Sequence, residues 1–320
     1  MEEVKTYTET QRNNYDPTRT TALRNSFARS MKARFVELKN VLRVAIVDQD
    51  CFGLEKNKSS LLMQQVTPPG SGAFSWLRDP AKVESFMRWL RQQVDRGVLS
   101  ISVFQQVGSA IEGAWTNMYV LDAYKRGVIR ARYELKKAGF DVPSLEDLGG
   151  IEILLTSGPF HMDRVGLLYT RVYSDLRGIS DAMDTQISRI LTQGMIEGDS
   201  PALLARKLIA SIDGTGMGTL GLTDTLGRFI PAQTRAIMLA RTEIIRAFHL
   251  AAIQEYRNWG LEDVYVQAEW VTAGDDRVCE RCASLQGKIF TLDEIEPLIP
   301  LHPYCRCIAL PYIKEIIKYL

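Results

Sequence analysis

The stretch that decides the fold of the C-terminal part reads WVTAGDDRVCERCASLQGK at residues 270–288 and HPYCRC at residues 302–307. Two residues lie between Cys279 and Cys282, a spacing that lets both sulfurs reach one centre through a tight turn. After nineteen intervening residues that follow Cys282, the second stretch supplies an imidazole and two more thiols. Closing the intervening loop costs little entropy compared with what a bound metal contributes. The sequence therefore predicts that the two stretches meet in space.

These stretches predict a structural Zn²⁺ site whose candidate ligands are Cys279, Cys282, His302, Cys305 and Cys307. Structural zinc takes four ligands, and the single residue between Cys305 and Cys307 is an awkward spacing for one ion. The preferred set is therefore Cys279, Cys282, Cys305 and either His302 or Cys307. A closed set of protein ligands indicates a structural ion, because a catalytic zinc keeps an open position. Three alternatives stay open: disulfides, buried free thiols, and His302 as the cap of a turn.

Composition sets broad limits on the rest of the chain. The 320 residues are 46% hydrophobic and 24% charged, ordinary globular values with room for two domains. The 39 Lys+Arg balance 38 Asp+Glu, so net charge says nothing about nucleic acid. The polar N-terminus carries no apolar signal core, and no apolar run approaches the roughly 20 residues that cross a bilayer. We expect a soluble protein made in a cytoplasm, with Cys51 as a buried free thiol.

The periodicity of apolar residues predicts a mostly α fold with a small C-terminal α+β unit of short antiparallel strands beside the Cys/His cluster. Helices are expected from Thr20 or Thr21 to about Ala45, from Pro80 to Gly97, from about Ser102 to Lys137, over 163–176 and 180–196, from Pro201, and from Pro231 to about Asn258. Alternation predicts a strand over 264–270 and a shorter one over 288–291. The expected organisation is a polar arm and basic amphipathic helix (1–60), a helical region (61–178) and a third segment (179–320).

The first helix should have one basic face. Between residues 12 and 43 there are eight Lys/Arg and two acidic residues. The candidate contacts to DNA phosphates or to an acidic protein surface are Arg24, Arg29, Lys32, Arg34, Lys39 and Arg43. The alternative is a solvated helix face, because no aromatic platform is interleaved with the charges.

The sequence contains no complete catalytic motif. The glycine-rich segment 213–228 contains a formal G-x-G-x-x-G, but a helix precedes it where dinucleotide binding needs a strand. Arg241 and Glu243 are two apart on a helix and point to different faces, so they form no ready acid–base pair. The three histidines, His161 in an expected loop, His249 on a helix and His302, are too few for the base and the metal ligands of a nuclease. We predict that the protein is not an enzyme; ADP-ribosyl transfer and nuclease activity are the alternatives.

Several short motifs follow one another between residues 180 and 310. They are Gln193-Gly194-x-Ile196-Glu197-Gly198-Asp199-Ser200-Pro201, Ala205-x-Lys207-Leu208, Ala240-Arg241-Thr242-Glu243 with Ala247 and Ala251, then Gly260, Trp270, Asp276-Arg277-Val278-Cys279-x-x-Cys282, Leu285-x-Gly287 and His302-Pro303-x-Cys305-Arg306-Cys307. In their order and spacing the chain resembles the phage Mu F-like, or head morphogenesis, family of minor capsid proteins.

The resemblance implies a bacteriophage structural protein present in few copies inside the head of the virion, and in the host bacterial cytoplasm during assembly. Proteins similar to this one are associated with the portal vertex, act in head assembly and influence genome packaging or ejection. The implied partners are the portal protein, the capsid interior or scaffold and packaged DNA, with no membrane. The resemblance does not imply an established catalytic activity.

Overall fold

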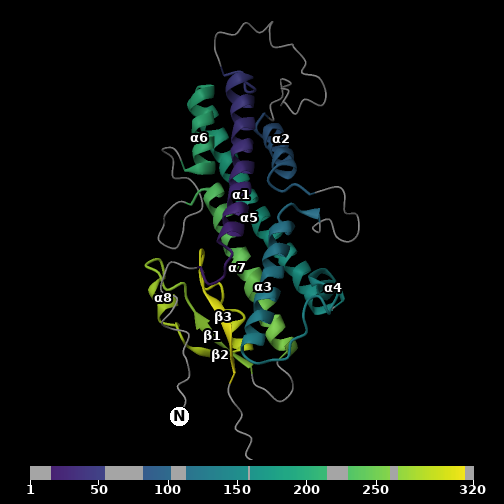
Figure 1. Cartoon of the computed structure of the whole chain (residues 1–320). Coiled ribbons are helices and arrows are strands. Elements are labelled where there is room, and N and C mark those ends of the chain that lie inside the picture. The colour runs from purple at the N-terminus through teal and green to yellow at the C-terminus, as the bar shows by residue number, and fades with distance from the viewer. Residues whose placement is uncertain are drawn as a thin grey trace, which may run out of the picture. The chain divides into compact units, whose positions relative to one another are not determined.

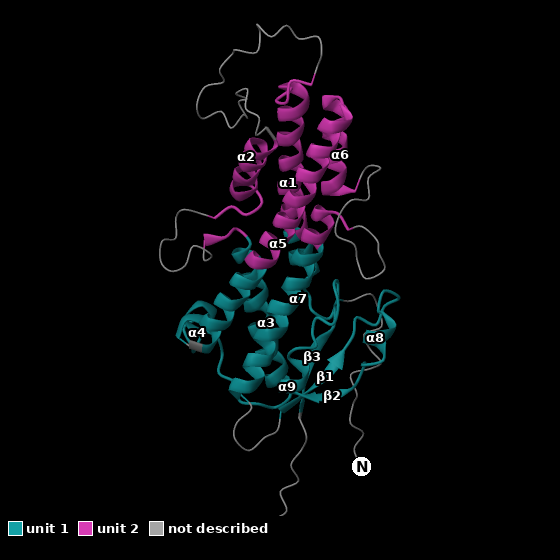
Figure 2. Ribbon diagram, turned by 180° about the vertical axis from the view of Figure 1, so that it is seen from behind, with its two compact units in different colours: residues 1–27, 116–172, 238–320 teal, residues 28–115, 173–237 magenta. Residues whose placement is uncertain are grey.

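The structure is a computed structural model of the chain, and it describes residues 16–54, 82–101, 113–157, 159–214, 230–259 and 266–313. The chain divides into two compact units (Figure 2). Unit 1 comprises residues 1–27, 116–172 and 238–320, and unit 2 comprises residues 28–115 and 173–237. The predicted segments 1–60, 61–178 and 179–320 stay a prediction, because the boundary near residue 60 lies outside the described residues.

Helices make up most of the described chain, and the strands come near its end (Figure 1). The elements in order are α1 (Thr21–Arg43), the π-helical turn η1 (Val44–Asp48), α2 (Lys82–Arg96), α3 (Asn117–Lys137), α4 (Ile151–Ser157), α5 (Pro159–Glu197), α6 (Pro201–Asp213), α7 (Ala232–Trp259), β1 (Val266–Val271), α8 (Glu280–Ala283), β2 (Ile289–Thr291), α9 (Leu292–Ile295) and β3 (Ile308–Ile313). The predicted class, mostly α with a small α+β unit, is confirmed.

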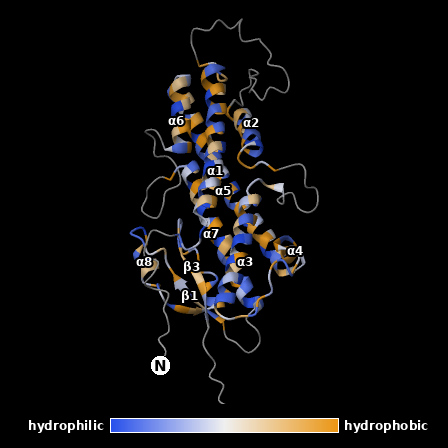
Figure 3. Cartoon of the chain, viewed as in Figure 1, coloured by the Kyte–Doolittle hydropathy of each residue, from blue (hydrophilic) through white to orange (hydrophobic). Residues whose placement is uncertain are grey.

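Unit 2 is a group of helices around an apolar core. The predicted stripe of α1 is buried as expected, and its residues in this unit include Met31, Phe35, Leu38 and Leu42. Hydrophobic and hydrophilic residues both occur along the helices, as the periodicity requires (Figure 3). Lys39 of α1 pairs with Asp213 at the end of α6, with 2.7 Å between Nζ and Oδ2.

Helix α6 begins and ends where the sequence indicates. Ser200 is extended and its Oγ accepts the backbone N–H of Leu203 at 3.3 Å, while Pro201 occupies the first turn. The helix ends at Gly214, whose φ of 81° is a left-handed conformation that glycine adopts without strain. This part of the chain therefore follows the ordinary rules of helix capping.

Unit 1 contains the sheet, packed on helices. Within the described residues the sheet has three strands in the order β2-β1-β3, and both pairs are antiparallel. In β1 every second residue is buried, among them Ala268 and the fully buried Trp270. These residues share one core with Leu135 of α3 and Tyr256 of α7, whose hydroxyl donates to the backbone oxygen of Ala309 at 3.2 Å. The cysteine-rich loops are thereby attached to a sheet that is held on the helices.

The strand β3 was not among the predicted strands. It pairs with β1 over six residues, from Val266 opposite Ile313 to Val271 opposite Ile308. Pro311 lies within it, and a proline inside an apolar run argues against a central strand. Pro311 lies opposite Ala268, and the backbone groups of Trp270, two residues further along β1, bond toward β2. Ala268 therefore also directs its backbone groups to β2, and the missing N–H of Pro311 points away from β1 and costs no ladder bond.

Two helix predictions are wrong in their limits. The predicted helices 163–176 and 180–196 are one helix, α5, because Gly178 continues the helical backbone instead of interrupting it. The helix predicted from Ser102 can be compared only from residue 113 on, and there α3 begins at Asn117, because Ala114 forms an isolated antiparallel bridge with Ile101 and the N–H of Trp115 donates to the oxygen of Ser100 at 3.4 Å. Residues 102–112 lie outside the described residues, as do 215–229 of the expected glycine-rich loop.

A buried polar network ties together three helices of unit 1. The hydroxyl of Tyr124 on α3 lies 3.0 Å from Nδ1 of His161, and Nε2 of that ring lies 3.1 Å from Oε1 of Glu255 on α7. The other carboxylate oxygen accepts from Arg132 at 3.0 Å and from Nε1 of Trp259 at 3.2 Å. His161 was predicted in a loop, but it lies in the first turn of α5, which begins at Pro159. Its ring can be buried because a hydroxyl and a carboxylate serve as its hydrogen-bond partners.

Helices α3 and α7 approach closely at Gly127. A Cβ added there would lie 2.3 Å from the backbone oxygen of Phe248 and 2.7 Å from the Cβ of Ala251. Backbone cannot yield as a flexible side chain does, so the two helices must separate to admit even one methyl group. The small residue is needed for this helix contact.

We expect Gly127→Ala to lower the free energy of unfolding by about 1–3 kcal/mol, because overpacking outweighs the better helix propensity of alanine. The control is Gly166→Ala in α5, where nothing lies within 4 Å of the added Cβ. That variant should be neutral or more stable by about 0.5–1 kcal/mol. Equal denaturation midpoints for the two variants would show that the α3–α7 contact adapts freely.

Candidate metal centre

The first pair of sulfurs is positioned by a short helix. The chain leaves β1 at Val271 and reaches Cys279, whose extended backbone caps α8. Its Sγ accepts the backbone N–H of Cys282 at 3.4 Å. This N–H···S bond fixes the turn between the two cysteines, so both sulfurs point to the same side of the loop.

The second stretch brings its donors to the same place. Nε2 of His302 lies 3.3 Å from Sγ of Cys279 and 3.2 Å from Sγ of Cys282. Sγ of Cys282 lies 4.0 Å from Sγ of Cys305. The donors form two groups, Cys279–Cys282–His302 and Cys282–Cys305–Cys307, with all ligand atoms of a group within 4.8 Å of one another. The predicted meeting of the two stretches is confirmed, and Cys282 belongs to both groups.

Three donor separations are close to those around a tetrahedral ion, whereas Cys279, Cys282, His302 and Cys305 are not all within 4.8 Å of one another. Zinc bonds of about 2.3 Å to sulfur and 2.05 Å to nitrogen imply separations of about 3.8 Å between sulfurs and about 3.5 Å between sulfur and nitrogen. The separations of 4.0 Å for Cys282–Cys305 and of 3.3 and 3.2 Å from His302 to its two cysteines differ from these by a few tenths of an ångström. Soft thiolates with one imidazole are also the donor type that structural zinc uses.

The orientation of His302 favours it as a ligand over the alternative role of a turn cap. Its Nδ1 lies 2.7 Å from the backbone oxygen of Pro303. A carbonyl oxygen only accepts, so Nδ1 carries the proton and Nε2 presents its lone pair to the sulfurs. Such a hydrogen bond behind the ring is how metal-binding histidines are oriented.

The buried thiols influence one another. The hydrogen bond from Cys307 lowers the pKa of Cys305, and donating that hydrogen bond raises the pKa of Cys307. Burial raises the pKa of Cys282 to about 12, and the neighbouring Cys305 adds to the shift. Without a cation, burial therefore disfavours the charged form of Cys282, and a metal ion would displace its proton.

An ion pair joins the two cysteine-bearing loops outside the cluster. Asp275 precedes the first pair of cysteines, and both its oxygens accept from Arg306, at 2.5 and 2.6 Å. Arg277 adds a contact of 2.8 Å. The hydrogen bond from Arg306 is the main reason that the pKa of Asp275 lies well below its usual range. Bidentate pairing fixes the planes of both groups, so the two loops keep their register.

The Arg241-Thr242-Glu243 motif of α7 supports the second loop. The Oγ1 of Thr242 accepts the backbone N–H of Tyr304 at 3.3 Å. Arg241 lies over the ring of the same tyrosine, 5.6 Å from its centroid, and Tyr304 has a left-handed φ of 63°. The sequence indicated Arg241 or Arg246 as a residue that could orient the cysteine unit, and the structure shows Arg241 and Thr242 in contact with the loop between His302 and Cys305.

The third residue of that motif, Glu243, forms ion pairs with two arginines. Glu243 is 2% exposed and pairs with Arg246 at 3.0 Å and with Arg171 at 3.3 Å. His249 is also buried, and burial lowers its pKa to about 4. Its Nε2 lies 3.2 Å from the oxygen of Ile295, so it packs against the end of α9.

The six predicted basic contacts differ in exposure: Arg24, Arg34 and Lys39 are buried or half-buried, and the other three are exposed. In unit 1, Arg24 is buried and pairs with Asp16 at 2.5 Å. In unit 2, Arg34 donates to the backbone oxygen of Gly97 at 2.6 Å, and Lys39 is paired as described above. The residues on the exposed side of α1 are Arg29, Lys32 and Arg43. Arg43 also lies 3.8 Å from Asp48 in an exposed pair, so four of the six predicted cations have partners within the fold.

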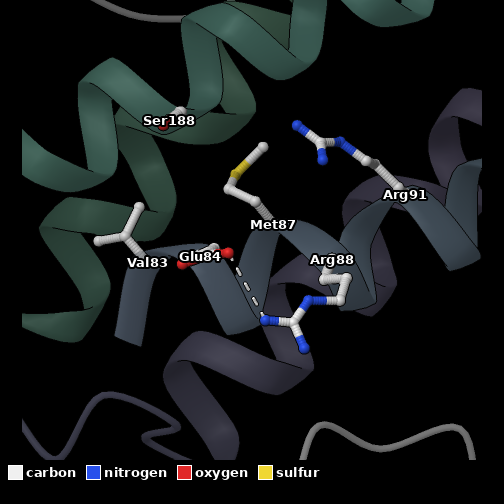
Figure 4. A pocket seen from close by; sticks show the side chains of 6 residues that line it. All are labelled: Val83, Glu84, Met87, Arg88, Arg91 and Ser188. Atoms are coloured by element: carbon white, nitrogen blue, oxygen red, sulfur yellow. Dashed lines mark ion pairs between the residues drawn. The ribbon is translucent and has the colours of Figure 1, made fainter. Parts of the chain in front are cut away.

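A surface hollow of about 340 Å³ lies in unit 2 between α2 and α5 (Figure 4). It is lined by Val83, Glu84, Met87, Arg88, Arg91 and Ser188. Arg88 faces Glu84 at 3.8 Å, and Arg91 pairs with Asp184 at 2.8 Å. Both arginines have carboxylate partners, and we assign the hollow no function.

Fold and site together define a mainly helical protein with a Cys/His cluster of metal-binding type in a small C-terminal α+β unit. Residues 185–310 match the family described as Phage Mu protein F like protein. This match confirms the resemblance seen in the sequence, and the matched segment includes the whole cluster. Comparison with curated proteins and with solved structures gave no match. Among the described residues, no helix is both long and apolar enough to span a bilayer.

Proposed function

We propose that this chain is a minor head protein of a tailed bacteriophage that acts inside the head, at the portal vertex, during assembly and in packaging or ejection of DNA. The observation that carries the proposal is the family match over residues 185–310, which contains every donor of the cluster and the motif that supports it. The neighbouring partners would be the portal protein and the interior of the capsid.

Within that role the cluster would hold a structural Zn²⁺ through Cys279, Cys282, His302 and Cys305. The strands it braces are only three to six residues long, and such a sheet buries too little apolar surface to be strongly stable alone. A structural zinc contributes on the order of 10 kcal/mol of apparent binding energy. The ion would therefore keep the two loops together, and the four ligands leave no position open for catalysis.

The proposal includes that the protein catalyses no reaction. ADP-ribosyl transfer would need a carboxylate free to face its substrate, whereas Glu243 is buried between Arg246 and Arg171. Incubating the protein with NAD and, separately, with plasmid DNA checks both enzymatic alternatives. Turnover of either compound above that of a heat-denatured sample would overturn the non-enzymatic role.

The proposed location of the chain inside the phage head can be tested on purified virions. Mass spectrometry of purified virions should find the chain at a few copies per particle, and native mass spectrometry should find it bound to isolated portal rings. The control is the major capsid protein, which should be present at far higher copy number and absent from the portal complex. Virions assembled normally without this chain would contradict a role in head assembly.

A second candidate function, binding to packaged DNA, rests on the exposed cations of α1. Deleting residues 1–45 would remove buried core residues such as Phe35 along with the charges, so substitution is the better test. In the triple variant Arg29→Gln, Lys32→Gln and Arg43→Gln we expect weaker DNA binding. The salt dependence, the slope of log K against log salt, should fall by about 3, close to one unit per lost phosphate contact.

The matched control changes three exposed cations of α3, namely Arg126, Lys136 and Lys137, to glutamine. Filter binding or fluorescence anisotropy at several salt concentrations gives the slope for each protein. If both triple variants reduce the slope equally, the interaction is a general effect of charge, and the exposed side of α1 is not a DNA contact.

A further inference from the structure

Access to the sulfurs of the cluster is unequal. Cys282, Cys305 and Cys307 are buried, whereas Cys279 is half-buried at the start of α8. A thiol reagent from solution therefore meets Cys279 first. The next sulfur along the chain, Cys282, lies three residues on and within 4.8 Å of it.

A Cys-x-x-Cys turn at a helix start is an arrangement in which the second cysteine can resolve a mixed disulfide on the first. The N–H of Cys282 already holds the Sγ of Cys279 at 3.4 Å, so the turn that this reaction needs is present. Cys305 and Cys307 are attached to the other loop, whose position depends on the Asp275–Arg306 ion pair. The sulfurs of Cys282 and Cys305 are 4.0 Å apart but belong to different loops, whereas Cys279 and Cys282 lie on one turn, so their disulfide needs no movement of one loop against the other.

We propose that Cys279 and Cys282 form a redox-sensitive pair: oxidation by a small disulfide joins their sulfurs and releases the metal ion. The inference rests on the proposed metal site, whose ligands it removes. The metal site would then be regulated: the ion would stay bound under the reducing conditions of a bacterial cytoplasm and would be released under oxidising conditions, which would free the two cysteine-bearing loops from each other.

The reaction balances in two exchange steps. The thiolate of Cys279 attacks a small disulfide RSSR, which forms a Cys279–SR mixed disulfide and releases one RS⁻. The sulfur of Cys282 then attacks that of Cys279, which forms the protein disulfide and releases the second RS⁻. Two electrons pass from the cysteine pair to RSSR. The remaining donors, His302 and the thiols of the second loop, are fewer than the four that a structural zinc takes.

The test uses the intact, metal-loaded protein and oxidised glutathione in the absence of air. A chromogenic chelator measures released metal, and peptide mapping by mass spectrometry locates the disulfide. We expect one metal ion released per Cys279–Cys282 disulfide formed, and recovery of the metal after dithiothreitol and zinc are added. Cys51→Ser serves as the matched control, because Cys51 lies outside the cluster, and it should release metal as the unaltered protein does.

Two outcomes would overturn the inference. One is a first disulfide that joins any other pair, such as Cys282–Cys305. The other is retention of metal and free thiols at glutathione disulfide concentrations that oxidise the unfolded protein fully. Metal content is measured before oxidation: reduced protein without metal would refute the metal site itself, and mapping of the first disulfide would still decide whether Cys279 and Cys282 react together.

Discussion

Replacing Cys282 with serine should abolish stoichiometric metal binding and unfold residues 266–313 locally, while the helices of unit 2 remain folded. Cys282 is the one donor that belongs to both groups of the cluster, so its loss leaves neither group complete. The hydroxyl of serine is a poor zinc ligand, and the binding energy at stake is on the order of 10 kcal/mol. Elemental analysis measures the metal, and hydrogen exchange measures protection of each segment.

Cys51→Ser is the control for this variant, because Cys51 is a buried free thiol of unit 2 and the substitution is the same. It should keep a full complement of metal and normal exchange in residues 266–313. If Cys282→Ser also keeps its metal, the cluster does not form the proposed site. If it loses metal without any change in exchange, the ion binds but does not brace the sheet.

The cluster could be predicted because its information is local. The Cys-x-x-Cys pair and the HPYCRC stretch each fix their donors by spacing alone, and the loop between them is short enough to close. The choice between His302 and Cys307 could not be predicted, because it depends on which ring nitrogen faces the sulfurs. That orientation comes from the hydrogen bond to the oxygen of Pro303, which has no signature in the sequence.

The basic helix shows the opposite case. Its apolar stripe was predicted from periodicity and is buried, because burial of a helix face is determined by spacing of three and four residues. The use of its charges was not predictable. Whether a cation faces solvent depends on partners distant in sequence, as for Lys39, whose carboxylate partner Asp213 lies 174 residues away.

The buried network of unit 1 lies beyond sequence reasoning for the same reason. Its hydrogen bonds join residues 37, 94 and 123 positions apart, on three helices whose packing brings them together. Tyr124, His161, Arg132 and Glu255 each look like an ordinary polar helix residue in the sequence. Only the packing turns them into one network in which each charged group has a partner.

We expect Glu255→Gln to lower the free energy of unfolding by about 3–5 kcal/mol, because it leaves the buried guanidinium of Arg132 without its counter-ion. Glu255 is fully buried, and its carboxylate accepts from Arg132, His161 and Trp259. Glutamine offers one accepting oxygen, and its amide group would face donors with another donor. Urea denaturation followed by circular dichroism measures the loss.

The matched control is Glu152→Gln, which removes a carboxylate from an exposed ion pair with Lys125. Exposed pairs contribute little, so the change there should stay under about 1 kcal/mol. A loss of the same size at Glu255 would mean that the network does not stabilise unit 1. A fully buried charge that contributes nothing to stability would then need another reason to be there, and the non-enzymatic proposal would have to be tested again at His161 and Glu255.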